Sequence, residues 1–394
     1  MAQDQSNVLL VANWNSDVGY AWWLMENFWI TIARHLEEKH HIECVLIYPE
    51  ITLIPETIKN SNIKVVECDF RLYTAGNIRT IHSLIKANHI GTVYLTDHPS
   101  YCLFYVALRT FGIRCIVVHD HTPGDRTPAR TWRKFLKRII QCLPILTADY
   151  FIAVTDFVYQ RFLNVACIPQ NKCFVAANGI IPIDLSSVDS DYCHRIFNIP
   201  HSHSIIVTTG RASTYKGIDF FILCANELLN NRAIDNIHFL FCGDGPDLDY
   251  FKRLALNYGL MDHFTFAGNR KDIREILPSC SIGFHASAGE VGYSLSILEY
   301  MSAGLITIVP DLPSVCLAIE HGHNGLIYES RNVQDACEAI ELALGMPERD
   351  MIRNFAINTI KDHLNLGNTN KAMIEIFDTI YNNCMKKSLQ NEKS

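Results

Sequence analysis

The feature that most constrains the fold of this chain is an alternation of short apolar runs with helical patterns. In the first half the apolar runs are 7–13, 43–49, 64–70, 92–98, 114–121 and 150–156. They are continuously apolar, so each strand must be buried on both faces, which is typical of a parallel sheet covered by helices. The first half is therefore expected to form a parallel α/β domain.

The same alternation starts again after a polar segment at 184–203. Its apolar runs are 204–213, 237–246, 264–268, 281–289 and 305–311. The predicted fold class is thus α/β, with two Rossmann-like, doubly wound parallel-sheet domains facing a central cleft. We assign the domains to 1–185 and 204–368, the linker to 186–203, and a terminal helix with a polar tail to 369–394.

Composition excludes several classes of protein. A formal net charge of −7 argues against a general nucleic-acid binder, which usually presents a broad basic face. Fourteen scattered cysteines without a C-x-x-C pair predict buried thiols in a reducing compartment rather than a disulfide framework or a zinc ribbon. The N-terminus resembles no signal peptide, and no apolar stretch reaches the roughly 18 residues of a spanning helix. A cytoplasmic enzyme is expected.

One loop after a predicted strand carries two cations. Arg211 and Lys216 flank a Ser/Thr turn, and Gly217 opens the next helix. A guanidinium holds two phosphate oxygens in a fork and an ammonium adds a movable point charge, so the pair suits a diphosphate. Two solvated surface cations are the alternative.

A second strand-end loop, at 287–304, carries two carboxylates and a predicted helix start. Free N–H groups at Ser294, Leu295 and Ser296 could face an oxyanion. Glu299 is interpreted as the partner of Ser296 in a capping box, with hydrogen bonding to ribose as the alternative. Glu290 lies in the loop before the helix, and it is the stronger candidate for a contact with a sugar.

Three further loops are weaker candidates. Gly243 opens the stretch 243–246, which is interpreted as a tight turn that needs a positive φ, with part of a nucleotide-binding site as the alternative. Gly19 would allow close approach of a phosphate, although no G-x-G-x-x-G fingerprint is present. His119 follows a strand and could bond a sugar hydroxyl, but no partner for metal ligation is identified. Asp189 and Asp191 form a D-x-D that we interpret as a polar turn without a divalent ion.

The segment 126–140 is basic and apolar at once. Six Arg and Lys residues and no acid interleave with Trp132, Phe135, Leu136, Ile139 and Ile140. As a helix this segment could lie on an anionic membrane surface. A core-facing helix with a solvated basic face explains the pattern equally well.

Taken together, these loops resemble the retaining GT-B glycosyltransferases of family GT4. The matching strings are GRASTYKG, FCGDGP, FAG, EVGYSLSILEYMSAG and NGLIY in the second half, with VVHDH and AANGI in the first. Each string is weak alone, but their order and spacing are specific. The resemblance covers most of the chain and is densest between 204 and 328.

The resemblance implies transfer of a sugar, with retained anomeric configuration, from a nucleotide-diphosphate sugar such as a UDP-sugar. It implies a donor-binding C-terminal domain, an N-terminal domain that binds a glycan, lipid-linked or small-molecule acceptor, and a terminal helix that crosses back. Arg211 and Lys216 would hold the diphosphate, with Gly19 near the phosphates and Glu299 on the ribose. His119 would lie near the transferred sugar. No cofactor or metal is expected.

One departure from the family pattern concerns the two glutamates. The family places seven residues between them, whereas eight lie between Glu290 and Glu299, so Val291 takes the expected place. Either the loop holds one extra residue and Glu290 reaches the sugar, or this contact is lost. Two other functions remain open: a nucleotide-sugar epimerase of the same fold, and a non-catalytic protein that binds sugar nucleotides.

Overall fold

A computed structural model of the chain describes residues 6–17, 22–71, 74–124, 126, 130–291 and 293–391. The chain forms two compact units, each described by itself below. The first comprises 1–122, 126–177 and 369–394, and the second comprises 123–125 and 178–368.

The first unit is built on one sheet of seven parallel strands, in the order β3-β2-β1-β4-β5-β6-β7. The strands are β1 (Asn7–Val11), β2 (Cys44–Tyr48), β3 (Lys64–Glu67), β4 (Ile90–Thr96), β5 (Cys115–Asp120), β6 (Tyr150–Ala153) and β7 (Cys173–Val175). The helices are α1 (Trp23–His40), α2 (Glu56–Lys59), α3 (Ala75–Ala87), α4 (Leu103–Thr110), α5 (Thr131–Gln141), α6 (Asp156–Arg161) and most of α14 (Leu366–Asn391). Sequence analysis anticipated the first six strands and overlooked the three-residue β7.

The central strands of this sheet are buried, as their continuous apolar runs predicted. Leu9, Leu10 and Val11 of β1 are fully buried, and β1 pairs in parallel with both β2 and β4. The strand order reverses between β1 and β4. Loops that follow these two strands therefore leave the sheet at a topological switch point, where ligands of such folds bind.

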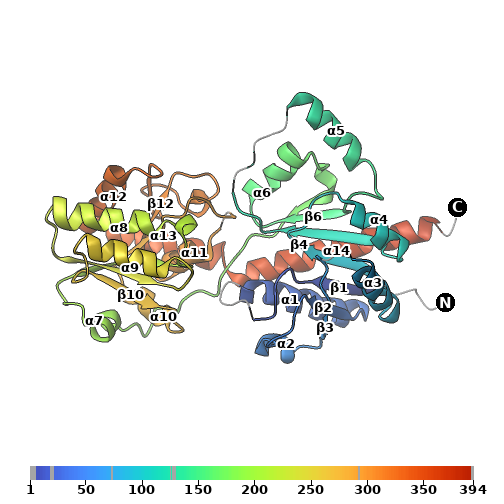
Figure 1. The fold of residues 1–394 in the computed structure, drawn as a ribbon, viewed down its shortest axis with the longest axis horizontal. Helices are drawn as coiled ribbons and strands as arrows, with labels where there is room; N and C mark the ends of the chain where they lie inside the picture. The colour runs from blue at the N-terminus through green and yellow to red at the C-terminus, as the bar shows by residue number, and fades with distance from the viewer. Residues whose placement is uncertain are drawn as a thin grey trace. The chain divides into compact units, whose positions relative to one another are not determined.

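The second unit repeats this design with six parallel strands, in the order β10-β9-β8-β11-β12-β13. The strands are β8 (Ser204–Thr209), β9 (Ile237–Cys242), β10 (Phe264–Gly268), β11 (Ile282–Phe284), β12 (Ile306–Pro310) and β13 (Leu326–Tyr328). The helices are α7 (Tyr192–Phe197), α8 (Ile218–Asn226), α9 (Leu248–Asn257), α10 (Ile273–Ile276), α11 (Leu295–Ser302), α12 (Val333–Gly345) and α13 (Arg349–Asp362). Helices cover both faces of each sheet (Figure 1). The prediction of two parallel α/β domains is confirmed.

The polar segment expected to link the domains belongs to the second unit. Within it α7 inserts Cys193 into an apolar cluster that also contains Ile199. Asp189 accepts hydrogen bonds from Arg195 and from the main-chain N–H of Asp191. The D-x-D motif is thus a hydrogen-bonded turn, as predicted.

Cysteine placement agrees with the sequence-based prediction. All fourteen cysteines are free thiols and ten of them are buried. Among the described residues, no helix is both long and apolar enough to cross a membrane.

Candidate active site

The candidate site of the second unit lies where its strand order reverses. β8 and β11 are neighbours in the sheet, but each continues outward to strands on opposite sides. Two loops leave the sheet here, one joining β8 to α8 and the other joining β11 to α11. They are the two loops that the sequence singled out for phosphate and sugar contacts.

These two loops pack against each other through main-chain atoms. The N–H of Ala288 donates to the carbonyl oxygen of Tyr215 at 3.0 Å. Gly217 has φ +73°, and a Cβ placed there would lie 2.0 Å from the carbonyl oxygen of Ala286. Only glycine satisfies both the left-handed conformation and this close approach. The glycine that opens α8 therefore allows the β8 loop to contact the β11 loop.

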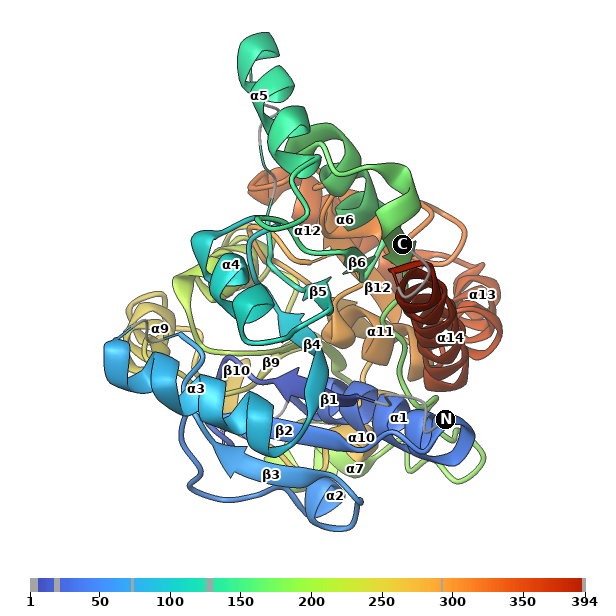
Figure 2. The same cartoon turned by 90° about the vertical axis from the view of Figure 1, so that its right-hand side faces the viewer.

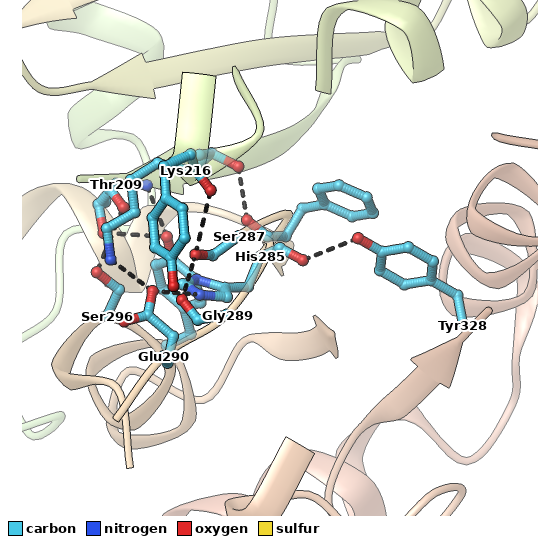
Figure 3. Close-up of polar contacts among 12 residues, drawn as sticks. Thr209, Lys216, His285, Ser287, Gly289, Glu290, Ser296 and Tyr328 are labelled. Atoms are coloured by element: carbon cyan, nitrogen blue, oxygen red, sulfur yellow. Dashed lines mark hydrogen bonds and ion pairs between the residues drawn. The ribbon is translucent and has the colours of Figure 1, made fainter. Parts of the chain in front are cut away.

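Contact between the loops brings three chemically active side chains together (Figure 3). Nζ of Lys216 lies 2.5 Å from Oε1 of Glu290, and Nε2 of His285 lies 3.1 Å from the same oxygen. The side chains of Glu290 and His285 are 10% and 4% exposed, whereas that of Lys216 is 29% exposed. A carboxylate, a cation and an imidazole thus form a partly enclosed cluster, which we call the Lys216 cluster.

The Lys216 cluster keeps Glu290 ionised. Burial acts to raise the pKa of this carboxyl group, but the charge of Lys216 and then the hydrogen bond and charge of His285 outweigh it. The result is a pKa lowered from 4.5 to about 2. Glu290 is therefore a hydrogen-bond acceptor at neutral pH, and it is not a proton donor.

Glu290, rather than Val291, is the loop residue that places a carboxylate on Lys216. The extra residue between the two glutamates is thus accommodated in the loop. Whether Glu290 also contacts a sugar stays a prediction. His285 escaped the sequence analysis, although its position directly after β11 was a signal that could have been used.

Arg211 differs from Lys216 in its surroundings. It is exposed at the end of β8, and its guanidinium has no hydrogen-bond or ion-pair partner among the residues that the structure describes. Lys216 is balanced by Glu290, whereas the charge of Arg211 is unbalanced. Arg211 is therefore the cation of this loop that is available to an anionic ligand.

The positive φ expected in the turn 243–246 occurs at Gly245, with φ +159°, and not at Gly243. A Cβ at Gly243 would instead lie 1.8 Å from the carbonyl oxygen of Gly210, in the loop after β8. Gly243 thus allows two strand-end loops to approach each other.

The helix start after the β11 loop is correctly placed, but its capping was misinterpreted. α11 begins at Leu295 with Ser294 as its N-cap, and the Ser294 side chain makes no capping hydrogen bond. Ser296 is the second helical residue, and its hydroxyl donates to the carbonyl oxygen of Thr209. The proposed capping box of Ser296 with Glu299 is therefore wrong. Glu299 is buried, with 5% of its surface exposed.

A tyrosine of α11 completes the connection to β8. The Tyr300 hydroxyl accepts a hydrogen bond from the main-chain N–H of Thr209 at 2.6 Å. Tyr300 is fully buried. Together with the hydrogen bond from Ser296 to Thr209, both labelled in Figure 3, this contact holds the start of α11 to the end of β8.

In the first unit, His119 lies at the end of β5 and is fully buried. Its Nδ1 is hydrogen-bonded to the Tyr94 hydroxyl, and its Nε2 has no hydrogen-bond partner among the described residues. Burial, with a further contribution from His121, lowers the pKa of His119 well below 6.5. His119 is thus a buried, neutral imidazole. Gly19 lies outside the described residues.

A residue that sequence analysis overlooked lies beside this histidine. Asp97 follows β4 with φ +56°, an uncommon conformation for a residue other than glycine. Its carboxylate accepts a hydrogen bond from the N–H of His121. Burial nevertheless raises the pKa of Asp97 to about 7. No sequence pattern pointed to it, because a left-handed aspartate has no local signature.

A cavity of about 70 Å³ opens at the same edge of this sheet. Its polar lining includes His98, Asp120, Arg126 and Arg161. Arg161, only 6% exposed, pairs with Asp120 at 3.1 Å, whereas the exposed Arg126 donates to the Thr122 hydroxyl. Burial lowers the pKa of His98 below 6.5 and keeps it neutral, so two guanidinium groups against one carboxylate leave this cavity suited to a small anionic group.

α5 exposes its apolar residues to solvent. Trp132 is 63% exposed and Phe135 is 67% exposed. Within α5 only Gln141 is buried. Both views show the helix standing away from the sheet of its unit (Figures 1 and 2). The alternative of a core-facing helix is therefore wrong, and α5 presents an exposed basic and apolar surface.

Sequence comparison matches the chain to two families. Residues 190–361 match "Glycosyl transferases group 1", and residues 25–182 match "Glycosyltransferase Family 4". An uncharacterized glycosyltransferase of Bacillus subtilis is 27% identical over 192 residues, which cover 47% of this chain and 52% of that protein. The chain therefore spans about half the length of this relative.

A second relative and a solved structure have more specific names. An Escherichia coli UDP-Gal:alpha-D-GlcNAc-diphosphoundecaprenol alpha-1,3-galactosyltransferase is 24% identical over 66% of this chain and 68% of its own length. The Anabaena protein HepE, solved in complex with UDP-glucose, matches with a TM-score of 0.72 at 15% identity, over 95% of this chain and 99% of its own. The latter likeness concerns the fold alone.

Proposed function

This chain belongs to the group 1 glycosyl transferases of the GT4 type, and on that premise we propose that it transfers a sugar from a UDP-sugar to a lipid-linked acceptor with retention of configuration. The observation that carries the proposal is the Lys216 cluster at the switch point of the second unit. It lies on the same strand-end loop as the unbalanced guanidinium of Arg211. A diphosphate is the anion that two such cations suit best.

The proposed chemistry depends on charge that develops on the leaving diphosphate. Arg211 binds two phosphate oxygens, and Lys216 supplies a second charge while Glu290 and His285 hold its position. The free N–H groups at Ser294 and Leu295 add the partial positive charge of a helix N-terminus. These groups stabilise the departing phosphate as it gains negative charge. We therefore propose that transfer needs no metal and no cofactor.

The donor sugar and the ribose are assigned to the carboxylates of the second unit. We propose that Glu290 accepts hydrogen bonds from hydroxyls of the transferred sugar and that Glu299 accepts them from the ribose. The ionised state of Glu290 supports the first role, because an anionic oxygen is a strong acceptor. Gly243 contributes by letting the loops approach each other.

Acceptor binding is assigned to the first unit. We propose that the cavity beside Asp120 and Arg161 takes a phosphate group of the acceptor, with Arg126 as the exposed cation. His119 would bond a sugar hydroxyl through Nε2. The diphosphoundecaprenol acceptor in the name of the E. coli relative supports a phosphorylated lipid as the acceptor class.

Lipid-linked acceptors reside at a membrane, and α5 offers a surface for contact with one. We propose that Trp132 and Phe135 insert at the head-group level while the basic residues of 126–140 attract anionic lipid. The protein would then work on the cytoplasmic side, peripheral to the inner membrane face. The cavity and α5 share a wall, since Lys137 of α5 donates to the carbonyl oxygen of Val165, a cavity residue.

A donor-binding experiment tests the assignment of the diphosphate. Calorimetry should show that Arg211→Ala weakens UDP binding by about 10- to 150-fold, the equivalent of about 1.5–3 kcal/mol for one charge-assisted contact. Arg253→Ala, which removes an exposed arginine of α9 in the same unit, is the matched control and should bind normally. Equal binding by wild type and Arg211→Ala would refute the assignment.

Turnover separates the three candidate functions. A transferase releases UDP from a UDP-sugar and forms a new glycoside only when an undecaprenyl-diphosphate-sugar acceptor is present. An epimerase would convert the sugar nucleotide without the acceptor, and a binding protein would give neither product. Arg126→Ala is expected to raise KM for the acceptor and leave UDP affinity unchanged.

Co-sedimentation with vesicles tests the membrane contact. The full chain should pellet with vesicles that contain phosphatidylglycerol and not with vesicles of phosphatidylcholine alone. Trp132→Ser/Phe135→Ser should abolish pelleting, whereas Leu256→Ser, at the equally exposed Leu256 of α9, should not. Equal pelleting with both kinds of vesicle, and by the wild type and the α5 double variant, would contradict the proposal.

A further inference from the structure

A cluster of side chains able to bind a metal lies between α1 and α14 in the first unit. His35 and His40 come from the last turns of α1, and Asp378 comes from α14. One ligand atom of each residue lies within 4.8 Å of the others. Nε2 of His35 is 2.8 Å, and Nε2 of His40 is 3.5 Å, from the same oxygen, Oδ1 of Asp378.

The three side chains are held by packing and are not loose on the surface. Their side-chain exposures are 15%, 14% and 25% for His35, His40 and Asp378. The His40 ring stacks on Tyr381 of α14, with centroids 3.9 Å apart. α1 and α14 lie side by side in both views (Figures 1 and 2). The ligand atoms therefore come from two rigid helices that already contact each other.

A simple ion pair does not account for the whole cluster. Lys39 lies 2.6 Å from Oδ2 of Asp378 and already balances the carboxylate charge. The other oxygen faces two imidazole nitrogens, one of them at 3.5 Å, which is too long for a good hydrogen bond. Two imidazoles and a monodentate carboxylate that converge on one point form a donor set that is typical of zinc.

We propose that His35, His40 and Asp378 bind a divalent transition metal, zinc above all, that crosslinks α1 to the C-terminal helix. Imidazole ligands favour zinc, cobalt and nickel over magnesium and calcium. Three protein ligands leave a fourth tetrahedral position for water. Lys39 stays on the second carboxylate oxygen and orients it, as outer contacts of metal ligands do.

The consequence concerns how the last helix is held. From Thr369 onward α14 belongs to the first unit, whereas the residues just before it belong to the second. A metal at this cluster stabilises the packing of α14 on α1 and binds only the folded unit. The site is separate from the donor loops, so it stands apart from the metal-independent transfer proposed above.

The test uses the full chain after treatment with a chelator. Zinc should bind at one equivalent by elemental analysis and raise the melting temperature, whereas magnesium should do neither. Cobalt should give weak visible bands of nitrogen and oxygen ligation without the intense near-ultraviolet band of a thiolate. A thiolate band would show that cysteines bind the metal and would overturn the proposal.

Variants assign the bound metal to the cluster. His35→Ala/His40→Ala should lose the equivalent of zinc and the rise in melting temperature. Asp378→Asn, which keeps the side-chain shape, should weaken zinc binding in a folded protein even where the double variant fails to fold. His201→Ala is the control: it removes a histidine that pairs with Asp191 and whose side chain is 68% exposed. This variant should bind zinc like the wild type. Unchanged stoichiometry in Asp378→Asn would refute the site.

Discussion

The two units share one sheet design but differ in what their strand-end loops carry. In the second unit the loops after β8 and β11 interlock and place Lys216, Glu290 and Arg211 at the switch point, so charge dominates. At the corresponding edge of the first unit, His119 is buried and neutral beside a cavity lined by both signs of charge. The same sheet topology thus carries a charged site in one unit and a buried neutral histidine in the other.

The difference teaches that the sheet fixes where a ligand can bind, while loop residues fix which ligand binds. Parallel strands deliver their loops to one edge regardless of sequence. A diphosphate needs cations, and the second unit holds Arg211 and Lys216 on one loop that is packed against the loop carrying Glu290. An acceptor that has both sugar and phosphate groups suits the mixed lining of the first unit.

The packing of the β8 loop on the β11 loop in the second unit should be the feature most easily disrupted by one added methyl group. Gly217→Ala adds a methyl group in a left-handed conformation and 2.0 Å from a carbonyl oxygen. Left-handed strain of about 1–2 kcal/mol and overpacking of about 1–3 kcal/mol together predict a loss of about 2–5 kcal/mol. Urea denaturation should show this loss, and UDP binding should disappear with the loop geometry.

Gly259→Ala is the matched control for this prediction. Gly259 has φ +69°, nearly that of Gly217, but a Cβ there meets no atom within 4 Å. Only the strain of about 1–2 kcal/mol remains. Equal losses for the two variants would show that the loops do not interlock as described.

The Lys216 cluster comes next in expected effect. Lys216→Met leaves the buried carboxylate of Glu290 without its cation and should cost about 3 kcal/mol. Glu290→Gln removes the anion, so the double variant should recover part of this loss. A double-mutant cycle measured by urea denaturation gives the coupling. Additive losses would contradict the ion pair.

Glu290 also predicts a dependence on pH with a definite sign. Its pKa is about 2 in the folded protein against 4.5 for an unperturbed glutamate. The stabilisation is therefore complete above pH 4.5 and is lost as pH falls toward 2. Glu290→Gln should remove this part of the acid sensitivity.

Histidines give both units a common sensitivity at milder pH. Burial, partly opposed by Asp120, lowers the pKa of His121 in the first unit to about 4, and burial lowers that of His238 in the second to about 4. Unfolded histidine takes a proton near 6.5, so stability present above that pH is lost toward 4. Each residue should account for about 2 kcal/mol of destabilisation by about pH 5. His121→Gln and His238→Gln should each flatten the melting temperature between pH 6.5 and 5, whereas the exposed His201→Gln should not.

The parts of the fold that could be predicted from the sequence are those specified by residues close together in the chain. Continuous apolar runs predicted the long strands, because a strand that is buried on both faces is apolar at consecutive positions. β7 and β13 have only three residues each and were not predicted, whereas the equally short β11 was found inside the run 281–289. The start of α11 was predictable, whereas its capping was not, because Ser296 bonds Thr209 far away in sequence.

Candidate site residues could be predicted only where the residue type itself indicates the chemistry, as a charged side chain on a strand-end loop does. Arg211, Lys216 and Glu290 were found from loop position and charge. His285 and Asp97 were missed because their roles depend on contacts made by the fold: one bonds Glu290 and the other accepts from the N–H of His121. The close approach of Gly243 to Gly210 could not be predicted, because the two residues are distant in sequence.

The smallest predicted effect compares two buried tyrosines at the same edge of the two sheets. Tyr300 accepts from the main-chain N–H of Thr209, whereas Tyr94 bonds the ring of His119. Each Tyr→Phe change removes one hydroxyl and should cost about 1 kcal/mol in urea denaturation.

The two changes should affect turnover differently, because the Tyr300 hydroxyl bonds the backbone of Thr209 and the Tyr94 hydroxyl bonds the ring of His119. Tyr300→Phe frees the backbone of the Arg211 loop and should weaken UDP binding by a small factor. Tyr94→Phe leaves the loop of the second unit intact but removes the partner that fixes the His119 ring, so kcat should fall while UDP affinity stays normal. Should Tyr94→Phe leave kcat unchanged, His119 has no part in the transfer step, and this edge of the first unit serves acceptor binding alone.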